Sequence, residues 1–138
     1  MEFNKYEGIG KDGDKLKITI ASGPVIIEDG KVLVDKHGND EFWKFPGGRQ
    51  MDNLDFLSNA KIRVKEELGI DVELKGEPFV MAFEREKEYV ILVHYLAKRI
   101  GEVKMGEGVR EFKWLDINNL PEDCAPNIKP VLEHFKNG

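Results

Sequence analysis

The chain has 138 residues, of which 41% are hydrophobic, and this size fits one ordinary domain with its own core. The formal net charge is −5 with both signs interspersed, so no basic stripe offers the counterion release on which binding to extended nucleic acid depends. The N-terminal residues lack the charged-then-apolar pattern of a secretory signal, and no apolar run is long enough to span a bilayer, so we expect a cytoplasmic protein with no membrane partner.

Paired strands are predicted in the first quarter of the chain. Residues 1–14 are rich in Gly, Lys and Asp, and we expect an irregular or edge segment there. Apolar and polar side chains then alternate over Leu16–Ile20. Two β-branched runs, Pro24–Ile27 and Val32–Val34, flank Asp29-Gly30, which is a strong signal for a hairpin turn. The pattern therefore predicts two antiparallel strands.

A glycine turn and a helix are predicted next. Phe42–Phe45 favours a short aromatic strand that ends at Pro46-Gly47-Gly48. Its aromatic rings are typical of a core, and a pocket for stacking a nucleotide base is the alternative. Asp55 is a credible helix N-cap, and Gly69 is placed to end the helix. The apolar side chains between them form one stripe at helical spacing: Phe56, Leu57, Ala60, Val64 and Leu68.

The second half of the chain predicts further strands and a terminal helix. The charged run Glu84–Glu88 favours a solvated hairpin tip, and residues from about Pro126 to Lys136 carry apolar side chains at helical spacing. His94 lies in an apolar strand and is expected to be packed, and neither it nor His37 has metal-ligand spacing. The single cysteine, Cys124, excludes an internal disulfide. The predicted strands are Val72–Leu74, Phe79–Phe83, Tyr89–Leu96 and Glu111–Leu115.

The segment from Gly48 to Ile70 resembles the Nudix box. That pattern is Gly, five residues, Glu, seven residues, Arg-Glu, an aliphatic residue, any residue, Glu-Glu, any residue, Gly and an aliphatic residue. Its last third fits at Val64, Glu66, Glu67, Gly69 and Ile70. Its middle does not fit, because the Glu, Arg and Glu of the pattern are replaced by Leu54, Ile62 and Arg63. The box is therefore degenerate.

The resemblance covers most of residues 16–136, and it agrees with what the pattern of elements favours. Strands outnumber helices, and the helix of the box lies between two groups of strands. We therefore expect an α+β fold, a Nudix-type α/β/α sandwich around a mixed sheet. The chain is expected to form a single Nudix-like domain over residues 1–138.

The resemblance also implies a reaction. Nudix enzymes cleave a nucleoside diphosphate linked to another group, with Mg²⁺ or Mn²⁺ held mainly by glutamates of the box helix. Glu66 and Glu67 are thus implied as metal ligands and catalytic residues. Glu107, on a flexible turn before the last strand, is the candidate that completes the site, with Glu111 as the alternative. The implied substrate-binding residues are Gly47, Gly48, Arg49 and Arg63.

Arg63 puts the implied activity in question. At about 100° per residue, Arg63, Glu66 and Glu67 fall on one arc of the helix, so their side chains are expected to converge. A guanidinium at this position repels metal and is able to pair with either glutamate. Two functions stay open: a metal-dependent pyrophosphohydrolase with a weakened metal site, and an inactive Nudix-fold module that binds a nucleotide or phosphate. Its ligand in either case would be a small nucleotide or nucleotide sugar. Many Nudix domains pair as homodimers, so the oligomeric state stays open too.

Overall fold

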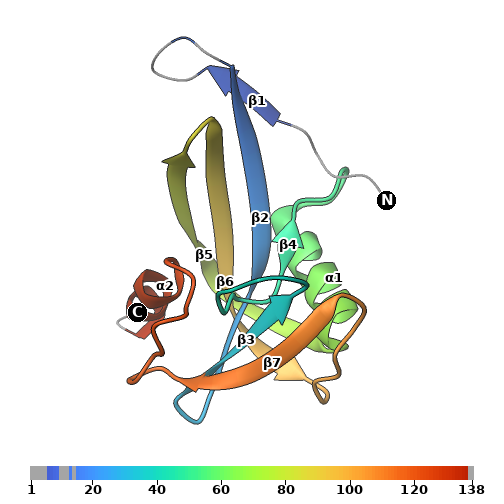
Figure 1. The fold of residues 1–138 in the computed structure, drawn as a ribbon. Coiled ribbons are helices and arrows are strands. Elements are labelled where there is room, and N and C mark those ends of the chain that lie inside the picture. The colour runs from blue at the N-terminus through green and yellow to red at the C-terminus, as the bar shows by residue number, and fades with distance from the viewer. Residues whose placement is uncertain (1–5, 10–12, 14, 137–138) are drawn as a thin grey trace.

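The computed structural model describes residues 6–9, 13 and 15–136. Figure 1 shows a long twisted sheet with one helix on each side. Neither helix in the described part of the chain is long and apolar enough to cross a membrane. The elements are β1 (Tyr6–Ile9), β2 (Lys15–Glu28), β3 (Lys31–His37), β4 (Gly48–Arg49), α1 (Phe56–Leu68), β5 (Asp71–Arg85), β6 (Glu88–Ile100), β7 (Val109–Asp116) and α2 (Ile128–Lys136).

The sheet is mixed, and β2 is its central strand. The strand order is β5-β6-β2-β3-β7, and both β1 and β4 pair with β2 outside this order. β2 and β6 run parallel over Lys17–Ile26 and Glu88–Ala97, whereas the other pairs are antiparallel. The predicted α+β class with a mixed sheet is confirmed.

The two faces of the sheet bury alternate residues of the same strands. On one face, Ile26 and Leu33 pack against Val64 and Leu68 of α1. On the other face, a second core joins the sheet to α2, with the buried residues Val25, Val32, Val34, Trp43, Leu115, Ile128, Val131 and Leu132. This alternation follows from the two-residue period of a strand and explains why the runs around the hairpin are apolar throughout. The predicted α/β/α sandwich is confirmed.

The predicted hairpin and helix boundaries are also confirmed. Asp29 and Gly30 have φ angles of 50° and 75°, as a two-residue hairpin turn requires. The Asp55 carboxylate accepts a hydrogen bond of 2.6 Å from the backbone N–H of Ser58, which makes Asp55 the N-cap of α1. Gly69 ends the helix with a φ of 68°.

The aromatic segment Phe42–Phe45 is not the regular strand that the sequence favours. Trp43 and Lys44 form isolated bridges to different partners, Cys124 and Asp35, so no run of pairs builds up. The ring of Trp43 is 7% exposed in the core beneath α2, which agrees with the core alternative. Burial of that ring, rather than strand pairing, determines the path of this segment.

One other predicted boundary differs. Val72–Leu74 and Phe79–Phe83, predicted as separate strands, belong to the single strand β5, because a register shift between Lys75 and Phe79 absorbs the residues between them. Residues 6–9 form the edge strand β1 against β2, which agrees with the edge alternative expected for that segment. Residues 1–5, 10–12 and 14 of that segment lie outside the described residues.

Candidate active site

The glycine turn of the box lies directly on the backbone of β2. Gly47 has a φ of 130°, and a Cβ atom at this position would lie 2.5 Å from the carbonyl oxygen of Ser22 and 2.6 Å from Cα of Gly23. Only glycine fits such an approach. The next residue, Gly48, pairs with Ser22 in the short ladder between β2 and β4. The turn is thereby fixed between β2 and the last turn of α1.

A buried asparagine holds this turn to the helix. The Asn59 side chain is fully buried. Its amide nitrogen donates to Ser22 Oγ at 2.8 Å and to the Gly48 carbonyl at 3.2 Å, and its oxygen accepts from the Met51 N–H at 3.0 Å. Ser22 Oγ in turn donates to the Phe56 carbonyl at 3.0 Å. The network ties the strand, the turn and the start of the helix into one unit.

Glu67 is the buried carboxylate of the site. It lies in the last turn of α1 with 5% of its surface exposed. Its Oε2 accepts a hydrogen bond of 3.1 Å from the Gly47 N–H. The same oxygen lies 3.4 Å from Nε2 of His37 on β3. A backbone donor therefore fixes the direction of this side chain toward β3.

Asp35 and His37 complete a compact group with Glu67. The two residues of β3 are separated by one position and so share a face of the strand. His37 Nε2 lies 3.4 Å from Asp35 Oδ1, and one ligand atom from each of the three residues lies within 4.8 Å of the others. Asp35 is only 1% exposed, and neither of its carboxylate oxygens has a hydrogen-bond partner. A distance of 3.4 Å is long for a hydrogen bond, so the contact with His37 is an ion pair of poor hydrogen-bond geometry.

The three side chains alter one another's pKa. The neighbouring carboxylates of Asp35 and Glu67 raise the pKa of His37 to about 10. Burial raises the pKa of Glu67, and the charge of Asp35 acts in the same direction, whereas His37 opposes it. We favour an imidazolium flanked by two carboxylates, because Nε2 lies equally close to an oxygen of each.

Arg63 pairs with the exposed glutamate of the box helix. Its Nη1 lies 3.4 Å from Glu66 Oε2, and its guanidinium carbon lies 2.8 Å from where a Cβ on Gly48 would be. Glu66 is exposed, whereas Glu67 is turned inward toward β3. The predicted ion pair between Arg63 and one of the glutamates is therefore present, and it is made with Glu66.

Glu107 lies next to the helix end without joining the ligand group. It is exposed on the turn before β7, and the N–H of its neighbour Gly106 donates to the Glu67 carbonyl at 2.7 Å. Glu111, the alternative, is exposed on β7 beside Arg110. Within the described residues, the group of possible metal ligands contains Glu67 but neither Glu66 nor Glu107. The predicted roles of these two glutamates, of Gly48 and of Arg49 stay predictions.

The sequence reasoning missed Asp35 and His37. Their signal is the period of the strand: Leu33, Asp35 and His37 lie on one face, and Leu33 packs against α1. A charged residue two positions after a fully buried leucine, on the same face, indicates a polar group directed at that helix. His37 was set aside because metal-ligand spacing was sought along the chain rather than across to the helix.

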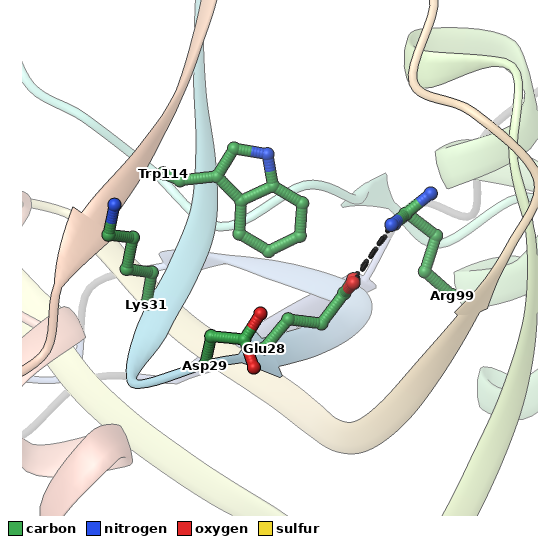
Figure 2. A pocket seen from close by; sticks show the side chains of 5 residues that line it. All are labelled: Glu28, Asp29, Lys31, Arg99 and Trp114. Atoms are coloured by element: carbon green, nitrogen blue, oxygen red, sulfur yellow. Dashed lines mark hydrogen bonds and ion pairs between the residues drawn. The ribbon is translucent and has the colours of Figure 1, made fainter.

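A cavity of about 320 Å³ lies elsewhere, at the opposite end of β3. Figure 2 shows its lining, in which Glu28 and Arg99 face each other beside Trp114. Arg99 donates two hydrogen bonds of 2.8 Å to the Glu28 carboxylate, so the charges of this pair are already matched. Lys31, at its rim, is about 20 Å along the strand from His37. We assign the site to the group around Glu67 because two carboxylates are buried there and the oxygens of Asp35 have no hydrogen-bond partner.

Comparison with known proteins identifies the family. The NUDIX domain family matches residues 19–135. An ADP-ribose pyrophosphatase of Methanocaldococcus jannaschii is 29% identical over 128 residues, which cover 86% of this chain and 75% of the relative. A candidate 8-oxo-dGTP diphosphatase of Bacillus subtilis is 27% identical over 117 residues, which cover 83% of this chain and 76% of the relative. The crystal structure of a MutT NUDIX hydrolase from Burkholderia pseudomallei has a TM-score of 0.75 at 23% identity, covering 84% of this chain and 96% of that one.

The chain belongs to the Nudix domain family. The resemblance predicted from the degenerate box is therefore confirmed, as is the leaning toward a pyrophosphohydrolase at the level of the family. Members of the family act on small nucleotide substrates and generally use divalent metals. The two curated relatives are named for different substrates, so the family alone does not select one.

Proposed function

We propose that this protein is a metal-dependent Nudix pyrophosphohydrolase that acts on a nucleoside diphosphate linked to another group, through an altered metal site. The observation that carries the proposal is the buried carboxylate of Glu67, which the Gly47 N–H holds in place beside Asp35 and His37. Buried carboxylates without full hydrogen bonding are costly unless a cation accompanies them. Such a group fits a site that binds a divalent cation.

The residues around Glu67 would have separate roles in binding the cation, orienting Glu67 and contacting phosphate. Asp35, His37 and Glu67 would hold the cation, which supplies neutralisation of charge on the phosphate oxygens. The Gly47 turn keeps Glu67 oriented. Arg63, beside Gly48, presents a permanent cation that is suited to phosphate oxygens. Water attacks one phosphorus, and the bond between that phosphorus and the bridging oxygen breaks. The products are two phosphate monoesters, and the protons of the water pass to solvent.

The substrate class comes from the relatives. ADP-ribose, named for the Methanocaldococcus relative, is a nucleoside diphosphate linked to a sugar, and nucleotide sugars have the same linkage. The expected cytoplasmic location is kept as part of this proposal, and the oligomeric state stays open.

Turnover with defined compounds tests the proposal. Purified protein is incubated with ADP-ribose, UDP-glucose, 8-oxo-dGTP and ATP, each with Mg²⁺, with Mn²⁺ or with chelator, and phosphate monoesters are measured. We expect metal-dependent cleavage of a nucleoside diphosphate derivative. Glu67→Gln keeps the shape of the side chain and is expected to lower kcat by about 10²-fold or more, the loss expected when a charge-stabilising group is removed. A control, Glu133→Gln on the exposed surface of α2, should leave kcat unchanged.

The inactive binding module remains the competing function, favoured by the ion pair between Arg63 and Glu66. It predicts saturable nucleotide binding in calorimetry with no product under any metal condition. Turnover that Glu67→Gln abolishes excludes it.

A further inference from the structure

We infer that Asp35, His37 and Glu67 form a binding site for a transition-metal ion such as Zn²⁺ or Co²⁺, which they bind in preference to Mg²⁺. The site departs from the box pattern because two of its three ligands come from β3. This inference refines the proposed hydrolase site, but metal binding is measured without turnover.

The two distances from His37 match those between ligands of one metal ion. Metal–ligand bonds to imidazole nitrogen and carboxylate oxygen are about 2.0–2.2 Å, so two ligands at a tetrahedral angle lie about 3.4 Å apart. His37 Nε2 lies 3.4 Å from Asp35 Oδ1 and 3.4 Å from Glu67 Oε2. The histidine therefore stands at ligand-to-ligand distance from both carboxylates.

The hydrogen-bond capacity of the group is insufficient without a further cation. Nε2 carries at most one hydrogen, yet it faces oxygens of two carboxylates. The buried Asp35 is left with two oxygens that accept no hydrogen bond. A divalent cation with a neutral imidazole balances both carboxylates.

The donor set selects the metal. Mg²⁺ prefers an octahedron of oxygen ligands and keeps several waters, whereas imidazole nitrogen suits Zn²⁺ and related ions. Two carboxylates and one histidine leave at least one position for water or a phosphate oxygen. The side chain of His37 is 35% exposed, so a phosphate oxygen could reach the group from solvent on the side of this residue.

Neighbouring contacts hold the ligands in place. The Gly47 N–H orients Glu67. The backbone N–H of His37 donates to Asp40 Oδ2 at 3.0 Å, and Arg110 Nη2 donates to the Asp40 carbonyl at 2.9 Å. The histidine thus stands on an ordered strand end. The hydrogen bond from Gly47 to the Glu67 carboxylate is the kind of supporting contact that metal ligands receive.

Titration of metal-free protein tests the inference. Binding of Zn²⁺, Co²⁺ and Mg²⁺ is measured by calorimetry, and the visible absorption of the Co²⁺ form reports coordination. We expect one Zn²⁺ or Co²⁺ per chain, bound at least about tenfold more tightly than Mg²⁺. His37→Ala and Asp35→Asn should each weaken binding by about 10-fold or more. His134→Ala, which removes an exposed histidine of α2, is the matched control and should leave binding unchanged.

Controls for folding allow each result to support or contradict the metal site. Circular dichroism and thermal unfolding establish that each variant folds, and Asp35→Asn keeps the shape of the side chain if His37→Ala does not fold. Equal affinities for Mg²⁺ and Zn²⁺, or tight binding that survives both substitutions, would overturn the inference. So would the absence of metal binding, which identifies the group as a closed imidazolium ion pair. Zn²⁺ binding without turnover contradicts only the hydrolase proposal, and turnover with Mg²⁺ but no Zn²⁺ site contradicts only this one.

Discussion

Replacing Gly47 by alanine should disrupt both the fold and the site. The added Cβ would lie 2.5 Å from the Ser22 carbonyl oxygen, on a residue whose φ is 130°. The backbone strain costs about 1–3 kcal/mol. Displacing the turn also breaks the hydrogen bond that the Gly47 N–H donates to the Glu67 carboxylate. Such a charge-assisted bond contributes about 1.5–3 kcal/mol. We therefore expect a loss of about 3–5 kcal/mol, a large part of the stability of a domain.

Two control substitutions separate the causes of that loss. Gly30→Ala introduces positive-φ strain alone, because φ is 75° and no atom lies within 4 Å of the added Cβ. Gly23→Ala introduces a collision alone, with the carbonyl of Pro46, because its φ is not positive. Neither glycine donates to Glu67. In thermal unfolding, Gly30→Ala should lower Tm by about 4 °C, and Gly47→Ala by about 10–20 °C.

The same variants report on the site. Zn²⁺ affinity should fall in Gly47→Ala, because Glu67 loses its orientation, and should be unchanged in Gly30→Ala, whose turn lies at the far end of β3. Equal falls in Tm for these two variants would refute the close approach of the turn to β2. Normal metal affinity in a folded Gly47→Ala protein would refute the orienting role of its N–H.

Three further predictions concern charges and the buried network. Arg63→Glu restores the carboxylate of the box pattern and removes the cation beside Glu66, so Mg²⁺ affinity in calorimetry should rise about tenfold or more, and an unchanged affinity would contradict the repulsion. Asn59→Ala removes three hydrogen bonds and should lower the free energy of unfolding by about 3 kcal/mol in urea; a loss below about 1 kcal/mol would show that water replaces them. Arg99 lowers the pKa of Glu28, so their pair stabilises the protein above pH 4.5, the ordinary pKa, and this contribution disappears as the pH falls through the lowered value. Glu28→Gln should thus be less stable at pH 7 by under about 1 kcal/mol, and this deficit should shrink as the pH falls below 4.5, whereas a difference that does not shrink would point to packing.

Local signals predicted the elements whose causes are local. The N-cap at Asp55, the end of α1 at Gly69 and the turn at Asp29-Gly30 each depend on a few neighbouring residues, and all three are confirmed. The aromatic strand at Phe42–Phe45 was wrong, because the burial of Trp43 under α2 determines the path of that segment. No window of the sequence contains that tertiary contact.

The candidate site was only partly predictable for the same reason. Glu67 was found through the box pattern, and its burial follows from its place beside Val64 and Leu68 on α1. Asp35 and His37 belong to a different element, and their approach to Glu67 depends on how β3 crosses the helix. A motif that is continuous in sequence does not report a ligand supplied from outside it.

The parallel pairing of β2 with β6 has a consequence for how the chain folds. Partners in this ladder, from Lys17 with Glu88 to Ile26 with Ala97, are about 70 residues apart, and such non-local contacts form slowly. During synthesis, Asp35, His37 and Glu67 all leave the ribosome before β6 does. The central strand then lacks its main neighbour, and its exposed edge is open to mispairing. Asp35 and His37 also pair with Phe112 and Val109 of β7, so the proposed ligand group should become rigid only after about residue 112 has emerged and β7 has closed the sheet.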